Sequence, residues 1–411
     1  MQRAPVTSKH SGTEEDPAYS EGDHRMQEIV HQFLNHITAI EIPMTKTCNL
    51  RCQYCYIRDP HYKEIKISSQ EIVRLYEPIR KTFPLMLKSG HPCSVIPWGA
   101  EPLCNWEAIE ESLEYLFNRY QDVPIDTHWS TNATTTPEEY IEFIRRHQER
   151  ITHIQISLDG PKEVHDFSRR TKEGQGSFLQ VTSHLAILTK EIPEMSRKIM
   201  FKSTLSPQQV ALGHFYLSSV FFWEELGLDQ SPVSLTKDCH YDEEALQQLD
   251  EDLERCRQYC QKNPGKSLGW FNVIETTSNV CSAGTNAVSV DIDGEIYPCH
   301  APATDDTKKQ YFRIGNVFTE DIDYKGITRI WFQKYSYLDI HAALCKGSHC
   351  PLFPEYRGAC WNCPIDMHNL NQIPFGGNIS YCRVMQILFK HYKQWGKEAH
   401  AQSRKNHHEC F

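Results

Sequence analysis

The sequence predicts an α/β protein, built as a partial (β/α)6, TIM-like barrel followed by a small cysteine-rich carboxyl-terminal domain. Extended apolar segments alternate with amphipathic ones between Ile37 and about Pro207, which is the pattern of βα units around a parallel sheet. Beyond residue 267 the pattern changes to one hairpin and a series of closely spaced cysteines. The 411 residues, 39% of them hydrophobic, suffice for one large core and a second, smaller unit.

The predicted strands of the barrel are short apolar runs. They are Ile37–Met44, Cys93–Trp98, Ile125–Ser130, Ile151–Leu158 and Lys198–Leu205. Between the strands, apolar residues recur at helical spacing, in several cases after a Ser, Asn or Thr that can cap a helix. These segments predict helices at Ser69–Thr82, Asn105–Tyr120, Pro137–Arg146 and Phe178–Lys190. We expect the chemistry at the carboxyl ends of the strands, where barrels of this kind place it.

The chain divides into four predicted parts. In order, they are a polar segment with a short amphipathic helix (1–36), the barrel (37–267), the cysteine-rich domain (268–385), and a carboxyl-terminal helix and tail (386–411). The longest predicted helix is Tyr241–Gln261, and the terminal helix is predicted over Arg383–Gly396. Residues Ala287–Cys299 alternate apolar and polar positions on both sides of an Asp-Gly pair, which predicts a β-hairpin.

Composition narrows the function classes. The formal net charge of −10 argues against nucleic acid as a partner, because phosphate binding favours a basic surface. No apolar run approaches the roughly 20 residues needed to span a bilayer, and the amino terminus does not resemble a signal peptide. We therefore expect a cytoplasmic protein with no membrane partner. In a reducing compartment, 16 cysteines point to metal binding rather than disulfides.

Three cysteines, Cys48, Cys52 and Cys55, stand at a C-x3-C-x2-C spacing directly after the first predicted strand. Three thiols on one short loop can turn toward a common centre, and thiolates are the usual ligands of iron–sulfur clusters. Three ligands for a four-iron cluster leave one iron open, which favours catalysis over electron storage. The alternative is a zinc loop or structural thiols, although zinc sites usually close with four ligands.

Polar motifs end three further strands. Trp98-Gly99-Ala100-Glu101-Pro102 combines small residues with a carboxylate, which allows close backbone approach to a ligand and acceptance of hydrogen bonds from an ammonium group. Ser130–Thr134 and Ser157–Pro161 supply hydroxyl, amide and carboxylate groups that can orient a ligand. The alternative for each stretch is a strand-end turn or a helix cap made by the same residue types.

The cysteine loop, with aromatic Tyr54 just before the third cysteine, resembles that of the radical S-adenosylmethionine (SAM) enzymes. The second motif is similar to the Gly-Gly-Glu-Pro motif of that family, with Ala100 in place of the second glycine. The resemblance implies that Cys48, Cys52 and Cys55 hold a four-iron cluster that SAM chelates. Reductive cleavage of SAM then yields a 5′-deoxyadenosyl radical that abstracts hydrogen.

The same resemblance implies a set of cofactor-binding residues at the strand ends. The stretch from Ser157 through His165, Asp166 and Arg169 looks like the sulfatase-maturase branch of the family. The residues assigned to SAM are Tyr54, Gly99, Ala100, Glu101, Pro102, Thr131, Asn132, Ser157, Asp159 and Arg169.

The Gly294-x4-Cys299 element and the later cysteines resemble the SPASM extension of peptide-modifying radical SAM enzymes, which carries two auxiliary four-iron clusters. The resemblance thus implies three [4Fe-4S] clusters in all. By position, Cys281, Cys299 and Cys363 belong to the first auxiliary cluster, and the second takes Cys345, Cys350, Cys360 and Cys382. The first set lacks a fourth cysteine, so its cluster has an open iron or takes another ligand, such as Cys410 or a histidine. A zinc-bound extension is the alternative.

His300 follows Cys299 directly, at a position where the sulfatase-maturase branch carries an Asp general base. Histidine can accept a proton near neutral pH, so His300 is the candidate catalytic residue. The change argues against formylglycine formation. We expect instead a maturase that crosslinks a ribosomally made precursor peptide, by a cyclophane-type C–C bond or, second, a thioether.

Other functions stay open at this point. They are an epimerising peptide maturase, an anaerobic sulfatase maturase, and a non-catalytic iron–sulfur electron carrier. An enzyme of this kind also needs a one-electron reductant of the flavodoxin or ferredoxin type. The segment before Ile37 is shorter than the leader-binding domain of some peptide-modifying relatives, so we expect no such domain.

Overall fold

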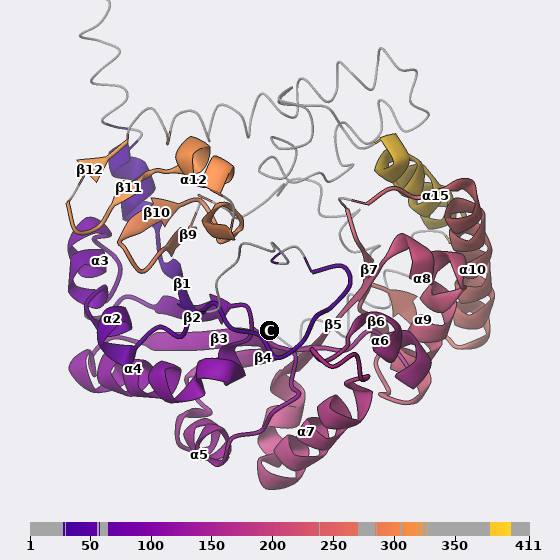
Figure 1. Ribbon diagram of the computed structural model, residues 1–411, viewed down its shortest axis with the longest axis horizontal. Coiled ribbons are helices and arrows are strands. Elements are labelled where there is room, and N and C mark those ends of the chain that lie inside the picture. Colours follow the sequence, from indigo (N-terminus) through magenta and orange to yellow (C-terminus); the bar gives the residue numbers. More distant parts are fainter. Residues whose placement is uncertain are drawn as a thin grey trace, which may run out of the picture.

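The computed structural model describes residues 28, 30–55, 57, 65–237, 239–269, 284, 286–304, 306–319, 321–323, 327 and 379–395. Six parallel strands form the barrel sheet. In spatial order they are β1 (Ala39–Thr45), β2 (Cys93–Gly99), β3 (Ile125–Thr131), β4 (Ile151–Ser157), β5 (Ile199–Leu205) and β7 (Val233–Leu235). Figure 1 shows the sheet as an open arc with helices on its outer side. The predicted partial (β/α)6 barrel is confirmed.

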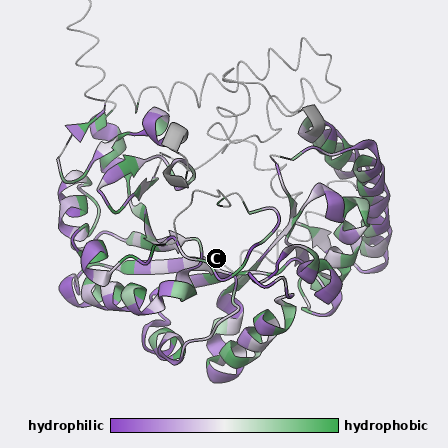
Figure 2. Cartoon of the chain, in the orientation of Figure 1, coloured by the Kyte–Doolittle hydropathy of each residue, from purple (hydrophilic) through white to green (hydrophobic). Residues whose placement is uncertain are grey.

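Helices cover the outer face of the arc. They are α2 (Ser69–Val73), α3 (Tyr76–Thr82), α4 (Trp106–Arg119), α5 (Glu138–His147), α6 (Lys162–Ser168), α7 (Phe178–Glu191), α8 (Pro207–Ala211), α9 (His214–Glu224) and α10 (Glu243–Lys262). In β1, Ile40, Ile42 and Met44 are fully buried, whereas Glu41 is half-buried. Figure 2 shows hydrophobic and hydrophilic residues mixed along these helices, as expected when one face packs on a sheet. Among the described helices, none is long and apolar enough to cross a membrane.

The helix predicted over Ser69–Thr82 is wrong in one respect, because the structure breaks it into α2 and α3. The Ser68 hydroxyl caps the start of α2. Arg74 caps its end, where its backbone N–H donates to the carbonyls of Gln70 and Ile72. Pro78 stands four residues after Arg74. In a continuous helix the N–H of residue 78 would donate to the carbonyl of Arg74. A proline lacks this N–H, and its ring collides with that carbonyl. The break therefore follows from Pro78.

Short elements complete the barrel. Two 3-10 helices, η1 (Pro102–Asn105) and η2 (Pro193–Lys198), follow β2 and precede β5. Strands β6 (Gln230–Ser231) and β8 (Ser267–Leu268) pair in a separate small sheet. Residues 30–36 are helical, which agrees with the short helix predicted before the first strand.

The predicted hairpin is present and extends the barrel sheet. Strands β9 (Ala287–Val290) and β10 (Glu295–Tyr297) are antiparallel, and β9 lies parallel to β1. Gly294 closes the turn at φ +88°, where a Cβ would meet the Phe318 ring at 2.4 Å. Strands β11 (Gly315–Asn316) and β12 (Asp321–Ile322) bring the sheet to ten strands. The 3-10 helix η3 (Ala301–Thr304) and helix α12 (Asp306–Phe312) stand between β10 and β11.

The last described element is α15 (Ile379–Trp395). It begins four residues before the helix predicted from Arg383, so the predicted boundary at 385/386 falls inside it and Cys382 lies on it. Ion pairs join α15 to α10: Arg383 to Glu243, and both Lys390 and His391 to Asp250 at 2.7 Å. Figure 1 shows the two helices side by side.

Candidate active site

The cysteine loop leaves the carboxyl end of β1, as predicted, and its backbone is tied to the segment after α6. The N–H of Arg51 donates to the carbonyl of Arg170 at 2.7 Å, and that of Gln53 donates to Ser168 at 3.0 Å. The N–H of Cys55 donates to the carbonyl of Cys52 at 3.2 Å. These bonds fix the backbone between the first and third cysteines of the motif.

All three thiols of the loop are half-buried. Burial raises the pKa of Cys48 to about 12, and the Glu101 carboxylate adds to the effect. Burial also raises the pKa of Cys52, against the influence of the Arg169 guanidinium. Thiols with such pKa values stay protonated near neutral pH unless a metal supplies positive charge, which deprotonates a coordinating thiol.

The donors of the loop are those of an iron–sulfur cluster. Cys52 lies within electrostatic reach of both Cys48 and Cys55. Three thiols on one short loop are soft donors, and thiolates are the ligands that a four-iron cluster takes. The residues present thus fit a cluster.

The Gly-Ala-Glu-Pro stretch lies directly against the end of β1. Gly99 has φ +145°, and a Cβ there would lie 2.2 Å from the carbonyl oxygen of Thr45. The N–H of Ala100 donates to that same oxygen at 3.2 Å, and the N–H of Glu101 donates to Thr47 at 3.1 Å. Ala100 has no positive φ and is half-exposed. The chain therefore needs glycine at 99 and accepts alanine at 100.

Glu101 is buried, at 1% exposure, and joins the ends of β2 and β3. Its Oε1 accepts from the N–H of Leu103 at 3.0 Å and from the Thr131 hydroxyl at 2.6 Å. Its Oε2 accepts from the N–H of Asn132 at 2.6 Å. Burial raises the pKa of this carboxyl group. Pro102 follows as the first residue of η1.

The stretch after β3 also contacts the cysteine loop. The Asn132 amide nitrogen donates to Asn49 Oδ1 at 2.9 Å and lies 3.8 Å from Cys48 Sγ. Ala133 is held at φ +52°, a conformation that costs about 1–3 kcal/mol for a residue with a Cβ. Its N–H donates to the Thr131 hydroxyl at 2.9 Å. Such strain beside a ligand-binding loop is typical of functional sites.

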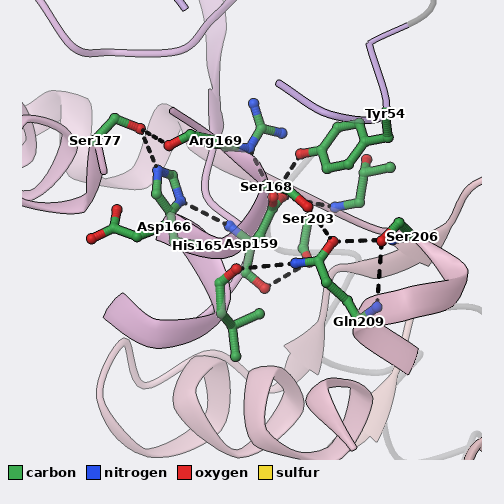
Figure 3. Close-up of polar contacts among 12 residues, drawn as sticks. Tyr54, Asp159, His165, Asp166, Ser168, Arg169, Ser177, Ser203, Ser206 and Gln209 are labelled. Carbon is green, nitrogen blue, oxygen red and sulfur yellow. Dashed lines mark hydrogen bonds and ion pairs between the residues drawn. The ribbon is translucent and has the colours of Figure 1, made fainter. Parts of the chain in front are cut away.

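The structure brings Tyr54, Asp159 and Arg169 together (Figure 3). The Tyr54 hydroxyl donates to Asp159 Oδ2 at 2.6 Å, and Arg169 Nε donates to the same oxygen at 3.0 Å. Asp159 Oδ1 accepts from the N–H of Thr204 at 3.0 Å. Their contact with SAM stays a prediction, as does that of half-buried Ser157 at the end of β4. Sequence reasoning chose these residues but missed their mutual pairing.

His300 lies just after β10, beside the first two strands of the barrel. Its Nδ1 is 3.0 Å from Glu41 Oε2, and its backbone N–H donates to the same oxygen at 3.0 Å. Its ring centroid is 5.1 Å from that of Trp98. Sequence reasoning missed Glu41. The available signal was a charged residue between two isoleucines in a buried strand.

Polar residues, either half-buried or exposed, line the inner faces of the central strands. His128 of β3 and His153 of β4 stack with ring centroids 4.3 Å apart. Burial lowers the pKa of His128 to about 4, and it also lowers the pKa of His153. Two residues after His128 in β3, the Ser130 hydroxyl donates to Gln155 Oε1 at 2.9 Å. At neutral pH both imidazoles are uncharged, so this part of the wall is polar and ring-rich without a cation.

Of the cysteines assigned to auxiliary clusters, the structure describes Cys299 after β10 and Cys382 on α15, and both are half-buried. The others lie outside the described residues: Cys281, Cys345, Cys350, Cys360 and Cys363. Their ligand roles stay predictions.

Comparison with known families agrees with this arrangement. The Radical SAM superfamily matches residues 42–205, and the SPASM iron–sulfur cluster-binding domain matches residues 281–364. The chain thus carries a radical SAM domain and a SPASM domain.

The chain is also similar to parts of several individual proteins. It is 31% identical over 152 residues to the cysteine-type anaerobic sulfatase-maturating enzyme of Clostridium novyi, covering 36% of this chain and 39% of that one. It is 32% identical over 156 residues to the serine-type enzyme of Bacteroides thetaiotaomicron, covering 36% and 35%. It is 25% identical over 206 residues to the radical SAM cyclopropyl synthase TigE of Paramaledivibacter caminithermalis, covering 48% and 41%. The chain therefore spans less than half the length of each of these relatives.

A solved structure resembles the fold over most of its length. The structure of native anSMEcpe with bound AdoMet matches with a TM-score of 0.64 and 20% sequence identity, covering 88% of this chain and 99% of that one. At this identity the likeness concerns the fold.

Proposed function

We propose that the protein is a radical SAM peptide maturase that crosslinks side chains within a ribosomally made precursor peptide. The observation that carries the proposal is the position of His300. A histidine from the SPASM side of the chain is held by Glu41 and Trp98 beside the barrel, because β9 pairs with β1. The chain thereby brings a proton acceptor to the strands whose ends carry the cysteine loop and the Gly99 motif.

The residues take distinct roles in this proposal. Cys48, Cys52 and Cys55 hold the catalytic cluster, and the backbone around Gly99 binds SAM. When bound, the cluster and SAM supply a hydrogen-abstracting radical, and the two auxiliary clusters supply an electron acceptor. A crosslink removes two hydrogens from the peptide, one as an atom and one as a proton with its electron. His300 takes the proton, and Glu41 fixes its ring.

The inner wall favours a C–C bond to an aromatic ring, the cyclophane type. Its rings are Trp98, His300, His128 and His153, and the first two lie 5.1 Å apart. Ring-lined walls favour aromatic side chains through offset or tilted ring contacts. A peptide substrate is supported by a solved structure of similar fold, native anSMEcpe with bound AdoMet and Cp18Cys peptide, which matches with a TM-score of 0.61. Thioether formation and epimerisation use the same hydrogen abstraction.

A second candidate is an anaerobic sulfatase maturase that forms formylglycine. It is favoured by the similarity to the sulfatase-maturating enzymes of Clostridium novyi and Bacteroides thetaiotaomicron. His300 would then serve in place of an aspartate general base. The two candidates differ in product, since formylglycine is an aldehyde and a crosslink is not.

The test is incubation of the anaerobically reconstituted protein with SAM, a flavodoxin-type or chemical one-electron reductant, and the peptide encoded beside its gene. We expect 5′-deoxyadenosine and a peptide lighter by two hydrogens that does not react with hydrazide reagents. A sulfatase-motif peptide that becomes hydrazide-reactive would favour the second candidate. Iron–sulfur protein that binds SAM but never yields 5′-deoxyadenosine would contradict both, and would favour an electron carrier.

A further inference from the structure

Arg169 is a buried cation at the back of the cysteine loop. Its side chain is 8% exposed and pairs with Asp159, whose side chain is fully buried, at 3.0 Å. A guanidinium removed from water is costly unless a carboxylate and hydrogen bonds compensate it. Burial of the Arg169 guanidinium beside the cysteine loop therefore costs folding free energy, which indicates a role for the charge at that place.

The charge faces the loop. The guanidinium carbon lies 5.4 Å from the centroid of the Tyr54 ring, which is a cation–π contact. Tyr54 stands between Cys52 and Cys55 in the loop. The N–H of Gln53, next to Cys52, donates to the carbonyl of Ser168, next to Arg169. The guanidinium therefore lies beside the part of the loop that bears the second and third thiols.

Asp159, the partner of the guanidinium, is itself held by hydrogen bonds to residues of several elements (Figure 3). Its Oδ1 accepts from Thr204 of β5, and its carbonyl accepts from the Ser203 hydroxyl at 3.0 Å. Its N–H donates to His165 Nδ1 at 3.3 Å, and His165 Nε2 contacts the Ser177 hydroxyl at 2.9 Å. That hydroxyl donates to the carbonyl of Arg169 at 2.9 Å. The network returns to the backbone of Arg169 and fixes it.

The residues on both sides of Arg169 support the loop by backbone bonds. The carbonyl of Ser168 accepts from Gln53, and the carbonyl of Arg170 accepts from Arg51. Ser168 is fixed in turn, because its hydroxyl donates to Gln209 Oε1 of α8 at 2.7 Å. The side chain of Arg169 thus reaches the loop from the centre of the segment that supports it.

We propose that Arg169 is the countercharge of the catalytic cluster. Reduction adds one negative charge to a cluster and its thiolates, and a fixed cation beside the cysteine loop stabilises that charge. Arg169 thereby raises the reduction potential of the cluster, and Asp159 and Tyr54 are positioning residues that keep it there. The inference rests on the proposed function only in requiring that Cys48, Cys52 and Cys55 hold the cluster.

The test is a potentiometric titration of the SAM-sensitive cluster signal, followed by electron paramagnetic resonance (EPR), with iron and sulfide measured in each sample. Arg169→Gln removes the cation and leaves Asp159, so we expect a more negative potential than in the wild type. Asp159→Asn keeps the cation and removes its partner's charge, so we expect a less negative potential. Arg170→Gln is the matched control, because that neighbouring arginine is exposed, and we expect the wild-type potential.

Two opposite shifts separate a charge effect from damage to the fold. Loss of packing would move both variants in one direction or release iron from both. If Arg169→Gln does not fold, the double variant Arg169→Gln, Asp159→Asn replaces it. A more negative potential in the double variant than in Asp159→Asn supports the role of Arg169, and equal potentials overturn it. Unchanged potentials in iron-replete variants, or an equal shift in Arg170→Gln, would overturn the role of Arg169. A wild-type protein without any SAM-sensitive signal would instead overturn the cluster assignment itself.

Discussion

His300 Nδ1 lies 3.0 Å from Glu41 Oε2, and the backbone N–H of His300 donates to the same oxygen at 3.0 Å. The two residues are 259 positions apart in the chain. A carboxylate that contacts one ring nitrogen fixes the orientation and tautomer of an imidazole.

We expect His300→Ala to lower the yield of crosslinked peptide by about 100-fold or more, the usual contribution of a general base. Formation of 5′-deoxyadenosine should continue, because hydrogen abstraction precedes the proton transfer. Glu41→Gln should lower the yield less, since its amide oxygen can still accept both hydrogen bonds. The measurement is the ratio of crosslinked peptide to 5′-deoxyadenosine, with exposed Glu138→Gln as control. An unchanged ratio in His300→Ala would remove His300 from the mechanism.

Gly99→Ala tests the backbone approach beside the cysteine loop. The new Cβ would meet the Thr45 carbonyl at 2.2 Å in a conformation, φ +145°, that alanine rarely adopts. We expect a loss of stability of about 1–3 kcal/mol and at least tenfold weaker SAM binding, measured by equilibrium dialysis on reconstituted protein. Ala100→Gly, which restores the usual family residue, should bind SAM like the wild type. Wild-type affinity in Gly99→Ala would show that this backbone does not shape the SAM site.

His184 predicts a pH dependence of stability. Its side chain is 1% exposed, its Nδ1 contacts the carbonyl of Thr135 at 3.0 Å, and its buried Nε2 has no hydrogen-bond partner among the described residues. Burial lowers the pKa of His184 to about 4. The imidazole takes up a proton more readily in the unfolded chain than in the folded one. The free energy of unfolding therefore keeps its full value above about pH 6.5 and decreases as the pH falls toward 4.

Urea unfolding at pH 7 and pH 5 measures this effect. Between these values His184 should cost the wild type about 2 kcal/mol of unfolding free energy, at 1.36 kcal/mol per pKa unit. In His184→Gln the loss between the two pH values should be smaller by that amount. Equal losses in both proteins would mean that His184 is protonated in the folded state as easily as in the unfolded chain.

The sequence was sufficient for the first five barrel strands because each is a local apolar run with a polar end. The sixth strand, β7, was not predicted, because its three residues, Val233–Leu235, are too few to show a pattern. The predicted strand Ile125–Ser130 and the observed β3, Ile125–Thr131, differ by one residue. The division of helix Ser69–Thr82 was visible in Pro78, whose clash with a carbonyl is a local property. The pairing of β9 with β1 was not visible, because no local pattern selects a partner some 250 residues away in the chain.

In the site, too, the sequence predicted the members and only the folded chain shows their contacts. The resemblance to the radical SAM family selected Tyr54, Asp159 and Arg169 as members of a ligand site, but only the folded chain shows that they pair with one another. Burial makes that pairing obligatory, since an unpaired buried charge is strongly destabilising. Glu41 was missed because apolar periodicity treats a single charge in a strand as an exposed position. In this structure it faces His300 instead.

The central claim is that the cysteine loop holds the catalytic cluster of a radical SAM enzyme with auxiliary clusters in its SPASM domain. Its most direct test is iron and sulfide content with EPR after anaerobic reconstitution, comparing the wild type with a Cys48→Ala, Cys52→Ala, Cys55→Ala variant. We expect about twelve irons per chain, falling to about eight in the variant with loss of the SAM-sensitive signal. A variant that keeps all its iron and that signal, or a wild type that holds zinc instead, would contradict the claim.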